Sequence, residues 1–390
     1  NTTPLDTLLN DGGGTTVFEN GAIEVDNDVT ISGNLTLKSD IVIIADDDVT
    51  FSGTINADLA ANNRKLTINT PGTTTFSAIV GGGAALGKLK TDDGTGADDT
   101  AINTTAISAT TVELNDAVVL GGNLAVTGTD VTFGGTVDAT GASTETLTIT
   151  ATGVTTLGGI AGGSAALGNL TTDSSGTTVL KANIFSDDVT FADDVILGGN
   201  VTIDVETGAT PTVTFTKSIN ADLAANNRTL TIEHAAGTTT FSNKIGLGSD
   251  GTFNTADDAA LGTLTTDSTG TTALNGGSIN ATTHSYNGPT TLGAHTTLYG
   301  TTVTTGAAGT IDGDTSGTAA LATAKDLIIT ATGVTTIGAA ISDVRDLTVN
   351  GEGTASLDAT ASTITTFRNQ VYTDALTLNA DVTFTGKDMT

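Results

Sequence analysis

An internal repeat with a period of ~82 residues constrains the fold of this chain more than any other feature of its sequence. The triplet Val-Thr-Phe ends at Phe51, Phe133 and Phe215, which are equally spaced. The segment 55–64 recurs unchanged as 219–228, two repeats later. Such a chain is an array of short units, and the usual division of 390 residues into two or three compact domains does not apply.

The copies set the expected organisation of the chain. Each of the first three has Val-Thr-Phe, then a Leu-Thr-Ile triplet or a close variant, a Thr-rich run and Ala-Ala-Leu-Gly. We expect residues 1–27 to form an N-terminal cap or exchange arm and residues 385–390 to form the C-terminal end. Residues 28–384 are then one continuous region of about four and a half repeats. The repeats start approximately at residues 49, 131, 213, 303 and 382.

Composition favours β-structure throughout. Thr, Val and Ile favour strands, and only 4 Pro interrupt potential strand ladders. The chain has 11 Phe, 3 Tyr and no Trp, so large aromatic cores do not hold it together. We therefore predict an all-β protein.

Short strands between Asn, Asp and Gly turns fit two all-β architectures. Tandem β-sandwich domains would match a unit of this length, but they normally bring a core Trp or Tyr and longer alternating strands. A parallel β-helix, or β-solenoid, instead stacks short strands from successive turns. We favour the solenoid. The spacing from Val29 to Val49 predicts turns of about 20 residues, hence about four turns per repeat and about 18 or 19 turns in all.

The charge balance excludes several partners. The formal net charge is −30, from 43 acidic and 13 basic residues, which excludes nucleic acid and disfavours anionic lipid. No apolar run approaches the ~18 residues of a membrane span. The sequence starts at Asn1 and its only Met is Met389, so either a signal peptide has been removed or this is a piece of a longer chain. From its acidic and uniform composition we expect a secreted bacterial protein, extracellular or at the cell surface.

Oxygen-rich loops are the candidate metal sites. Ten extra residues follow Phe241 in the third repeat, with side-chain oxygens at alternate positions before a carboxylate pair, as in loops that bind Ca²⁺. The candidate ligands are Asp250, Thr252, Asn254, Asp257 and Asp258, with a second set at Asp312, Asp314 and Ser316. A related Asp-rich run spans residues 92–99. The alternative is that Asp and Gly gather there because they tolerate turns.

No constellation in the sequence predicts catalysis. The three histidines, His234, His284 and His295, are scattered, and no nucleotide-binding glycine motif is present. Acidic pairs such as Asp187-Asp188 have no aromatic sugar platform beside them in the sequence. We predict that the chain is not an enzyme, with a polysaccharide-degrading β-helix enzyme as a less favoured alternative.

The duplicated segment at residues 55–64 and 219–228 predicts a turn excursion. One helical turn would end at Asn226-Asn227, which tolerate the left-handed conformation. Its cations, Arg64 and Arg228, are rare in so acidic a chain. We expect each to pair with a nearby Asp rather than to bind a ligand.

Several motifs resemble the repetitive passenger regions of giant bacterial surface and secreted proteins, the filamentous-haemagglutinin and autotransporter-like group. They are the Asp-Val-Thr-Phe openings at Asp48, Asp130, Asp188 and Asp381, the Leu-Thr-Ile triplets, and residues 167–178 with their partner 261–272. The resemblance implies a right-handed parallel β-helix that serves as a stalk, an adhesin or matrix material, as in a biofilm.

We expect a structural subunit of an extracellular filament, in which copies of the chain join end to end through open β edges. The N-terminal arm could also add a strand to a neighbour. Candidate contact residues are Leu5, Leu8, Leu9, Val17, Phe18, Val382 and Phe384. The alternative is a cell-surface adhesin or glycan-binding stalk, which predicts an exposed aromatic or carboxylate cluster around residues 284–299.

Overall fold

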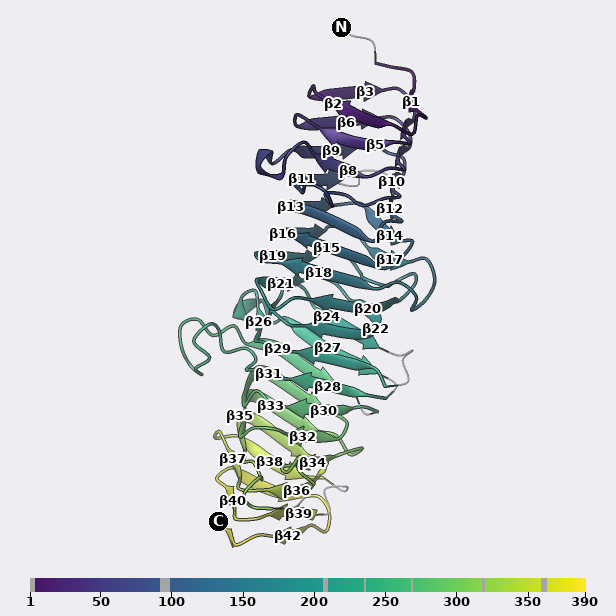
Figure 1. Ribbon diagram of the computed structural model, residues 1–390. Helices are drawn as coiled ribbons and strands as arrows, with labels where there is room; N and C mark the ends of the chain where they lie inside the picture. The colour runs from purple at the N-terminus through teal and green to yellow at the C-terminus, as the bar shows by residue number, and fades with distance from the viewer. Residues whose placement is uncertain are drawn as a thin grey trace. The chain divides into compact units, whose positions relative to one another are not determined.

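The computed structural model is an all-β parallel β-solenoid with about 17 turns of about 21 residues (Figure 1). It describes residues 4–91, 99–205, 210–234, 236–267, 269–317, 320–358 and 363–390. These ranges contain no α-helix, only the 3-10 segments η1 (Ala60–Asn62) and η2 (Ala224–Asn226). The predicted solenoid is confirmed, with slightly longer and fewer turns than expected. The tandem β-sandwich alternative is wrong, because successive turns pair in parallel.

The chain divides into two compact units, Asn1–Asp187 and Asp188–Thr390. In the first unit the strands form three parallel ladders. One ladder contains β1 (Leu8–Asn10), β4 (Val29–Ile31), β7 (Val49–Phe51), β10 (Thr74–Phe76), β12 (Asp99–Ile102), β14 (Ala117–Leu120) and β17 (Val137–Ala139). The next contains β2 (Thr15–Phe18), β5 (Asn34–Leu37), β8 (Ile55–Ala57), the start of β13 (Ala106–Leu114), β15 (Leu124–Gly128), β18 (Leu147–Ala151) and β20 (Leu167–Thr172). The third contains β3 (Ala22–Val25), β6 (Ile41–Ala45), β9 (Lys65–Asn69), β11 (Leu86–Thr91), the end of β13, β16 (Asp130–Phe133), β19 (Val154–Leu157) and β21 (Thr177–Leu180).

The second unit also has three parallel ladders. One contains β22 (Ile184–Phe191), in which the units divide, β25 (Thr212–Phe215), β28 (Thr238–Phe241), β30 (Thr271–Leu274), β32 (Thr290–Leu292), β34 (Thr310–Asp312), β36 (Ala340–Val344), β39 (Thr363–Thr366) and β42 (Thr383–Thr385). The next contains β23 (Asp194–Leu197), β26 (Ile219–Ala221), β31 (Ser278–Tyr286), β33 (Thr296–Thr305), β35 (Leu327–Ile337), β37 (Leu347–Asn350), β40 (Asn369–Tyr372) and β43 (Asp388–Met389). The third contains β24 (Val201–Val205), β27 (Thr229–His234), β29 (Leu261–Thr266), the later parts of β31, β33 and β35, β38 (Thr354–Leu357) and β41 (Ala375–Leu378).

Alternation along each strand builds the core. In β7, Val49 and Phe51 point inward and are buried, while Thr50 faces outward. Because the turns are in register, like residues stack on like. Phe191, Phe215 and Phe241 form a column in the second unit, with ring centroids 5.4 Å apart at each step. Outward threonines align in the same way, and this gives the β-branched residues a pleated surface on which to pack.

One sequence repeat does not equal four turns, which corrects the expectation from the sequence. Starting from β7, three turns lead through β10 and β12 to β14 in the same ladder. The next Val-Thr-Phe is β16, which lies two ladders further on and pairs with β13 and β19. The first repeat step is therefore about three and two-thirds turns, and equivalent motifs in the first unit lie on different faces.

The duplicated segment folds alike in both units, as the sequence predicted. Each copy leaves a strand, makes a 3-10 turn and ends at an Asn in the left-handed region, Asn63 or Asn227, both with φ 49°. Arg64 lies 2.9 Å from Asp58, and Arg228 lies 2.7 Å from Asp222. These hydrogen bonds hold the pKa of each Asp well below its usual range. The expected ion pairs are confirmed.

Candidate functional site

Acidic and amide side chains at the turn corners link one turn to the next. Asp28 Oδ1 accepts a hydrogen bond from the backbone N–H of Asp48, and Asp48 Oδ1 accepts one from Thr73. Asp130 does the same for Val154 at 2.9 Å. The Asp residues before Val-Thr-Phe at Asp48 and Asp130 thus have a structural role, which the sequence did not reveal because the partners lie 24 or 25 residues away.

A second set of residues, in the middle of β8, β17 and β26, shows that Asp and Asn are interchangeable in this role. Asn56, Asp138 and Asn220 occupy the same position in three successive repeats. Their Oδ1 atoms accept hydrogen bonds from backbone N–H groups of the next turn at 2.7, 2.8 and 3.0 Å. The shared requirement is an acceptor oxygen, since only one of the three side chains carries a charge.

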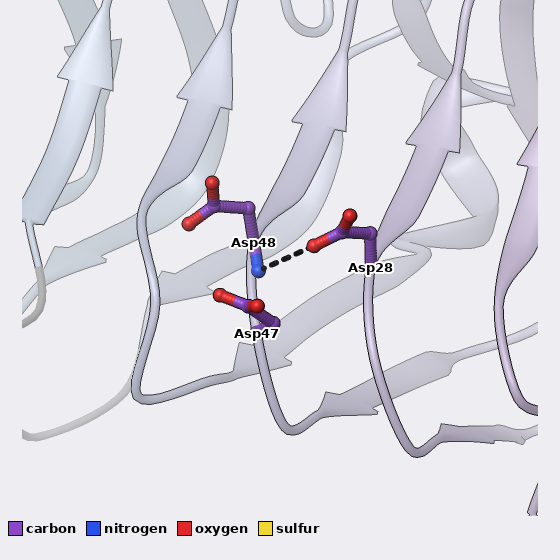
Figure 2. A group of neighbouring side chains, drawn as sticks. All are labelled: Asp28, Asp47 and Asp48. Carbon is purple, nitrogen blue, oxygen red and sulfur yellow. Dashed lines mark hydrogen bonds between the residues drawn. The ribbon is translucent and has the colours of Figure 1, made fainter.

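Three exposed carboxylates, those of Asp28, Asp47 and Asp48, form the candidate metal site (Figure 2). One oxygen of each lies within 4.8 Å of the others. Among the described residues, this is the only group of three or more Asp, Glu or His side chains that meets that spacing. The sequence placed Asp47 and Asp48 side by side, but only the pairing of β4 with β7 brings Asp28 to them.

The same carboxylates already take part in the corner bonds. Figure 2 shows the Asp28 carboxylate turned toward the backbone nitrogen of Asp48, whose own carboxylate points away from Asp28. An ionised carboxylate has about four acceptor positions, so one corner bond leaves oxygen free for an ion. Carboxylate oxygens are the ligands that hard divalent cations prefer. The three side chains could therefore hold a metal ion.

The inserted loop around Asp250 uses its oxygens on its own backbone. Asp257 Oδ2 accepts hydrogen bonds from Ser249 N and Oγ, each at 2.8 Å, and from Asp250 N at 3.1 Å. These bonds, with the Thr255 hydroxyl, hold the pKa of Asp257 well below its usual range. Within the loop, the predicted ligands make these contacts: Asp250 accepts from Thr252 N, and Asp258 accepts from Asn254 N. Calcium binding by this loop stays a prediction.

The second predicted set is also bonded internally. Asp314 Oδ1 accepts from Ser316 N and Oγ, and Asp312 Oδ1 accepts from Asp314 N. The hydrogen bond from the Ser316 hydroxyl, with smaller contributions from other hydrogen bonds, holds the pKa of Asp314 well below its usual range. Burial, together with repulsion from these two carboxylates, raises the pKa of Asp343. The third Asp-rich run, 92–99, lies outside the described residues except for Asp99.

The predicted contact residues lie in the first and last turns. Leu8 and Leu9 belong to β1, and Val17 and Phe18 belong to β2; both strands pair with the second turn of their own chain. Leu5 makes a bridge to Val25. At the other end Phe384 lies in β42 and pairs with Ile364, and Val382 lies just before that strand.

Two histidines that are far apart in the sequence each lie in a buried polar cluster. His234 Nε2 lies 3.1 Å from Thr239 Oγ1, and His234 Nδ1 lies 3.2 Å from Asp267 Oδ1. The order Thr-His-Asp is that of a catalytic triad, but Thr239 is 0% exposed, so no substrate reaches its hydroxyl. Nothing in the sequence indicated this set, because its members come from three neighbouring strands or turns.

His284 forms the second cluster, beneath a surface groove. Its Nε2 donates to Tyr299 O at 2.9 Å, so its Nδ1 is left to accept from the Tyr286 hydroxyl at 3.2 Å. Burial lowers the pKa of His284 to about 4. It also raises the pKa of Tyr286. His284 is therefore a neutral core residue, whereas the His295 side chain is exposed and lies 3.3 Å from Asp326.

The outer face of Tyr299 carries an aromatic stack. Phe253, from the inserted loop, lies parallel to the Tyr299 ring with centroids 3.8 Å apart. Phe253 is 42% exposed, and it is the only exposed Phe or Tyr among the described residues. It lines a groove with Asn280, Thr301 and Glu352, among others. Nothing in the sequence connects the inserted loop with Tyr299, and the fold brings the two into contact.

Comparison with known proteins identified no relative of this chain. No protein-family model, no curated protein and no solved structure matches the chain. Within the described ranges, no helix has the length and apolar character needed to cross a membrane. Function must therefore be inferred from the solenoid and its surface groups.

Proposed function

We propose that the chain is a structural subunit of an extracellular filament and that copies join end to end by continuing the stack of turns. The observation that carries this proposal is the exposure of inward-facing positions in β41 and β42. Leu378 is 51% exposed, although its register partner in the preceding turn, Leu357, is 0% exposed. Phe384 is half-buried, and its partner Ile364 is 0% exposed.

The first turn presents a similar surface. Leu8 and Phe18 are half-buried, while their partners Val29 and Leu37 are 0% exposed. Among the described residues, no strand pairs with the outer edges of β1 and β2. Parallel strands with free N–H and C=O groups above an uncovered apolar core favour the addition of another turn. A second copy of this chain supplies a turn of matching geometry.

The number of turns per sequence repeat, which is not a whole number, supports a structural role. Equivalent motifs in the first unit lie on different faces, so no one face collects the repeated residues. What the copies share is inward core residues, outward Thr residues and a side-chain oxygen that accepts a hydrogen bond from the next turn. A motif kept for a one-sided ligand surface would return to the same face. The repeat is therefore suited to stable extension of the stack.

We further propose Ca²⁺ as the ion for Asp28, Asp47 and Asp48, and an extracellular location for the protein. An exposed site with carboxylate ligands suits a hard cation that tolerates irregular geometry. The net charge of −30 keeps separate copies apart at low ionic strength, so salt or divalent cations should promote assembly. The resemblance to passenger regions of bacterial surface proteins rests on the sequence motifs.

Sedimentation velocity tests the end-to-end contact. The wild-type chain should form species larger than 38.5 kDa as its concentration rises. Leu378→Lys places a charge over the uncovered core and should leave a monomer. The matched control is Leu223→Lys, which alters a 64% exposed apolar residue in the η2 loop and should assemble like wild type.

Mixing adds a second criterion. A variant blocked at one end can still join a growing assembly by its other end, so small amounts of Leu378→Lys should shorten wild-type assemblies. A wild-type chain that stays monomeric at all concentrations would exclude the proposal. So would Leu378→Lys assemblies of wild-type size.

A further inference from the structure

The groove beside Phe253 runs along four successive turns of the second unit. Its lining comes from Asn280–Thr282 in β31, Gly300 and Thr301 in β33, Thr330 and Thr332 in β35, and Gly351 and Glu352 after β37. Asn280 pairs with Tyr299 and Tyr299 pairs with Thr330, and the pairing of β33 with β35 shifts by one residue between Gly300 and Thr302. At ~4.8 Å per paired strand, four turns extend for about 15 Å, enough for a chain-like ligand rather than a single small molecule.

Hydrogen bonds around the inserted loop and one ring contact place Phe253 at this groove. Lys244 Nζ donates to Gly251 O at 2.7 Å, and Asp257 closes the loop through its bonds to Ser249 and Asp250. Tyr299 covers one face of the Phe253 ring, and the exposed remainder lines the groove. The first two repeats have no such insertion. The extra residues therefore add an aromatic surface to this face, and a surface held in place by such contacts binds with less loss of entropy.

The chemistry of the lining identifies a ligand class. An aromatic ring packs against the C–H face of a sugar, while hydroxyl and amide side chains exchange hydrogen bonds with sugar hydroxyls. The groove offers Phe253 together with the threonines, Asn280 and the exposed Glu352 carboxylate, which accepts hydrogen bonds. The described lining residues include no Lys or Arg, and the chain is strongly acidic, so an anionic ligand is disfavoured.

We propose that this groove binds a neutral oligosaccharide, with Phe253 as the stacking platform and Glu352 as a hydrogen-bond acceptor. The site goes beyond the filament function and does not depend on it. A monomeric Leu378→Lys chain should bind as well as wild type. Failure of assembly and failure of sugar binding are therefore separate results.

The absence of Trp from the chain gives a direct reporter. Phe253→Trp places the only tryptophan of the protein at the platform. Neutral hexasaccharides of glucose, mannose, galactose and N-acetylglucosamine are titrated in turn while its emission is recorded. At least one should give a saturable blue shift, and calorimetry on the wild-type chain should give binding to the same sugar.

Matched variants separate stacking from loop structure. Phe253→Ala should weaken binding about tenfold. Leu321→Ala, at an apolar residue with 48% exposure elsewhere, should leave the affinity unchanged. Thr332→Arg fills the groove without altering the aromatic stack, and it should abolish binding.

Three results would overturn the proposal. They are no saturable response to any of the neutral sugars, sugar binding that Phe253→Ala and Thr332→Arg leave intact, and a response to tetramethylammonium without one to sugars. The last result would indicate that the ring and Glu352 recognise a cation instead.

Discussion

Single side-chain oxygens hold adjacent turns together, and Asp138 in β17 tests their contribution. Its Oδ1 accepts from Ser164 N and Ala165 N, and the residue is only 9% exposed. Asp138→Ala leaves these N–H groups without their acceptor and should lower the free energy of unfolding by about 1–2 kcal/mol. Asp138→Asn keeps the oxygen, as Asn56 and Asn220 do, and should be nearly neutral.

Urea unfolding of the two variants provides the comparison. Equal losses in Asp138→Ala and Asp138→Asn would mean that the charge matters and the acceptor does not. That result would contradict the explanation that Asp and Asn exchange between repeats because each supplies an acceptor oxygen.

His284 should make stability depend on pH. Its pKa is about 4 in the folded chain, against an ordinary value of 6.5. As the pH falls from 6.5 to 4, the unfolded chain therefore takes up this proton before the folded chain does. The free energy of unfolding should fall over that window by about 3 kcal/mol from this residue and be restored above pH 6.5.

His284→Gln isolates this contribution. The amide can still donate to Tyr299 O but does not titrate, so the stability of the variant should vary less between pH 4 and 6.5. Chemical denaturation at several pH values measures the difference. Parallel pH profiles for the two proteins would show that the imidazole is protonated as readily in the fold as outside it.

Among the elements, the stacked Phe column should dominate local stability in the second unit. Phe215 is 1% exposed and packs between Phe191 and Phe241. Phe215→Ala should cost about 3–5 kcal/mol, as expected for a cavity in a packed core. Phe215→Leu should cost much less, because Leu274 occupies the same ladder position opposite Phe241. A loss below about 1 kcal/mol for the Ala variant, measured by urea unfolding, would contradict the packing described.

The corner between β4 and β7 should respond to calcium. If Asp28, Asp47 and Asp48 bind Ca²⁺, the ion adds about 1.4 kcal/mol of stability at ten times its Kd and raises the Tm. The triple variant Asp28→Asn, Asp47→Asn, Asp48→Asn keeps the corner acceptors but loses the charges. Without calcium it should melt close to wild type, and it should show no rise when calcium is added.

Differential scanning calorimetry with and without calcium decides the matter. A Tm of the wild-type chain that calcium leaves unchanged would exclude the site. An equal rise in the triple variant would place the ion elsewhere.

The sequence predicted the elements well where the signal is local. Val-Thr-Phe and Leu-Thr-Ile alternate inward and outward residues, and Asn227 ends its loop in the left-handed region as expected. Sites that depend on register were not predictable. Asp28 meets Asp48 only because β4 pairs with β7, and Phe253 meets Tyr299 only because the inserted loop folds back.

For the whole molecule, the class of fold could be predicted from the sequence repeat, but the number of turns per repeat could not. The spacing from Val29 to Val49 predicted the length of that turn correctly, because these two residues are register partners. Other turns are longer, as from Val49 to Thr74, so one repeat covers fewer than four turns. Loop lengths at the corners set these differences, and a single sequence does not show how many residues each corner uses.

Fibre diffraction tests most directly whether copies extend the stack of turns end to end. Oriented filaments of the purified chain should give a reflection at ~4.8 Å along the filament axis, because paired strands from successive turns repeat in that direction. Filaments with that reflection perpendicular to the axis would mean side-by-side association. That result, or the lack of any filament, would contradict end-to-end extension of the stack.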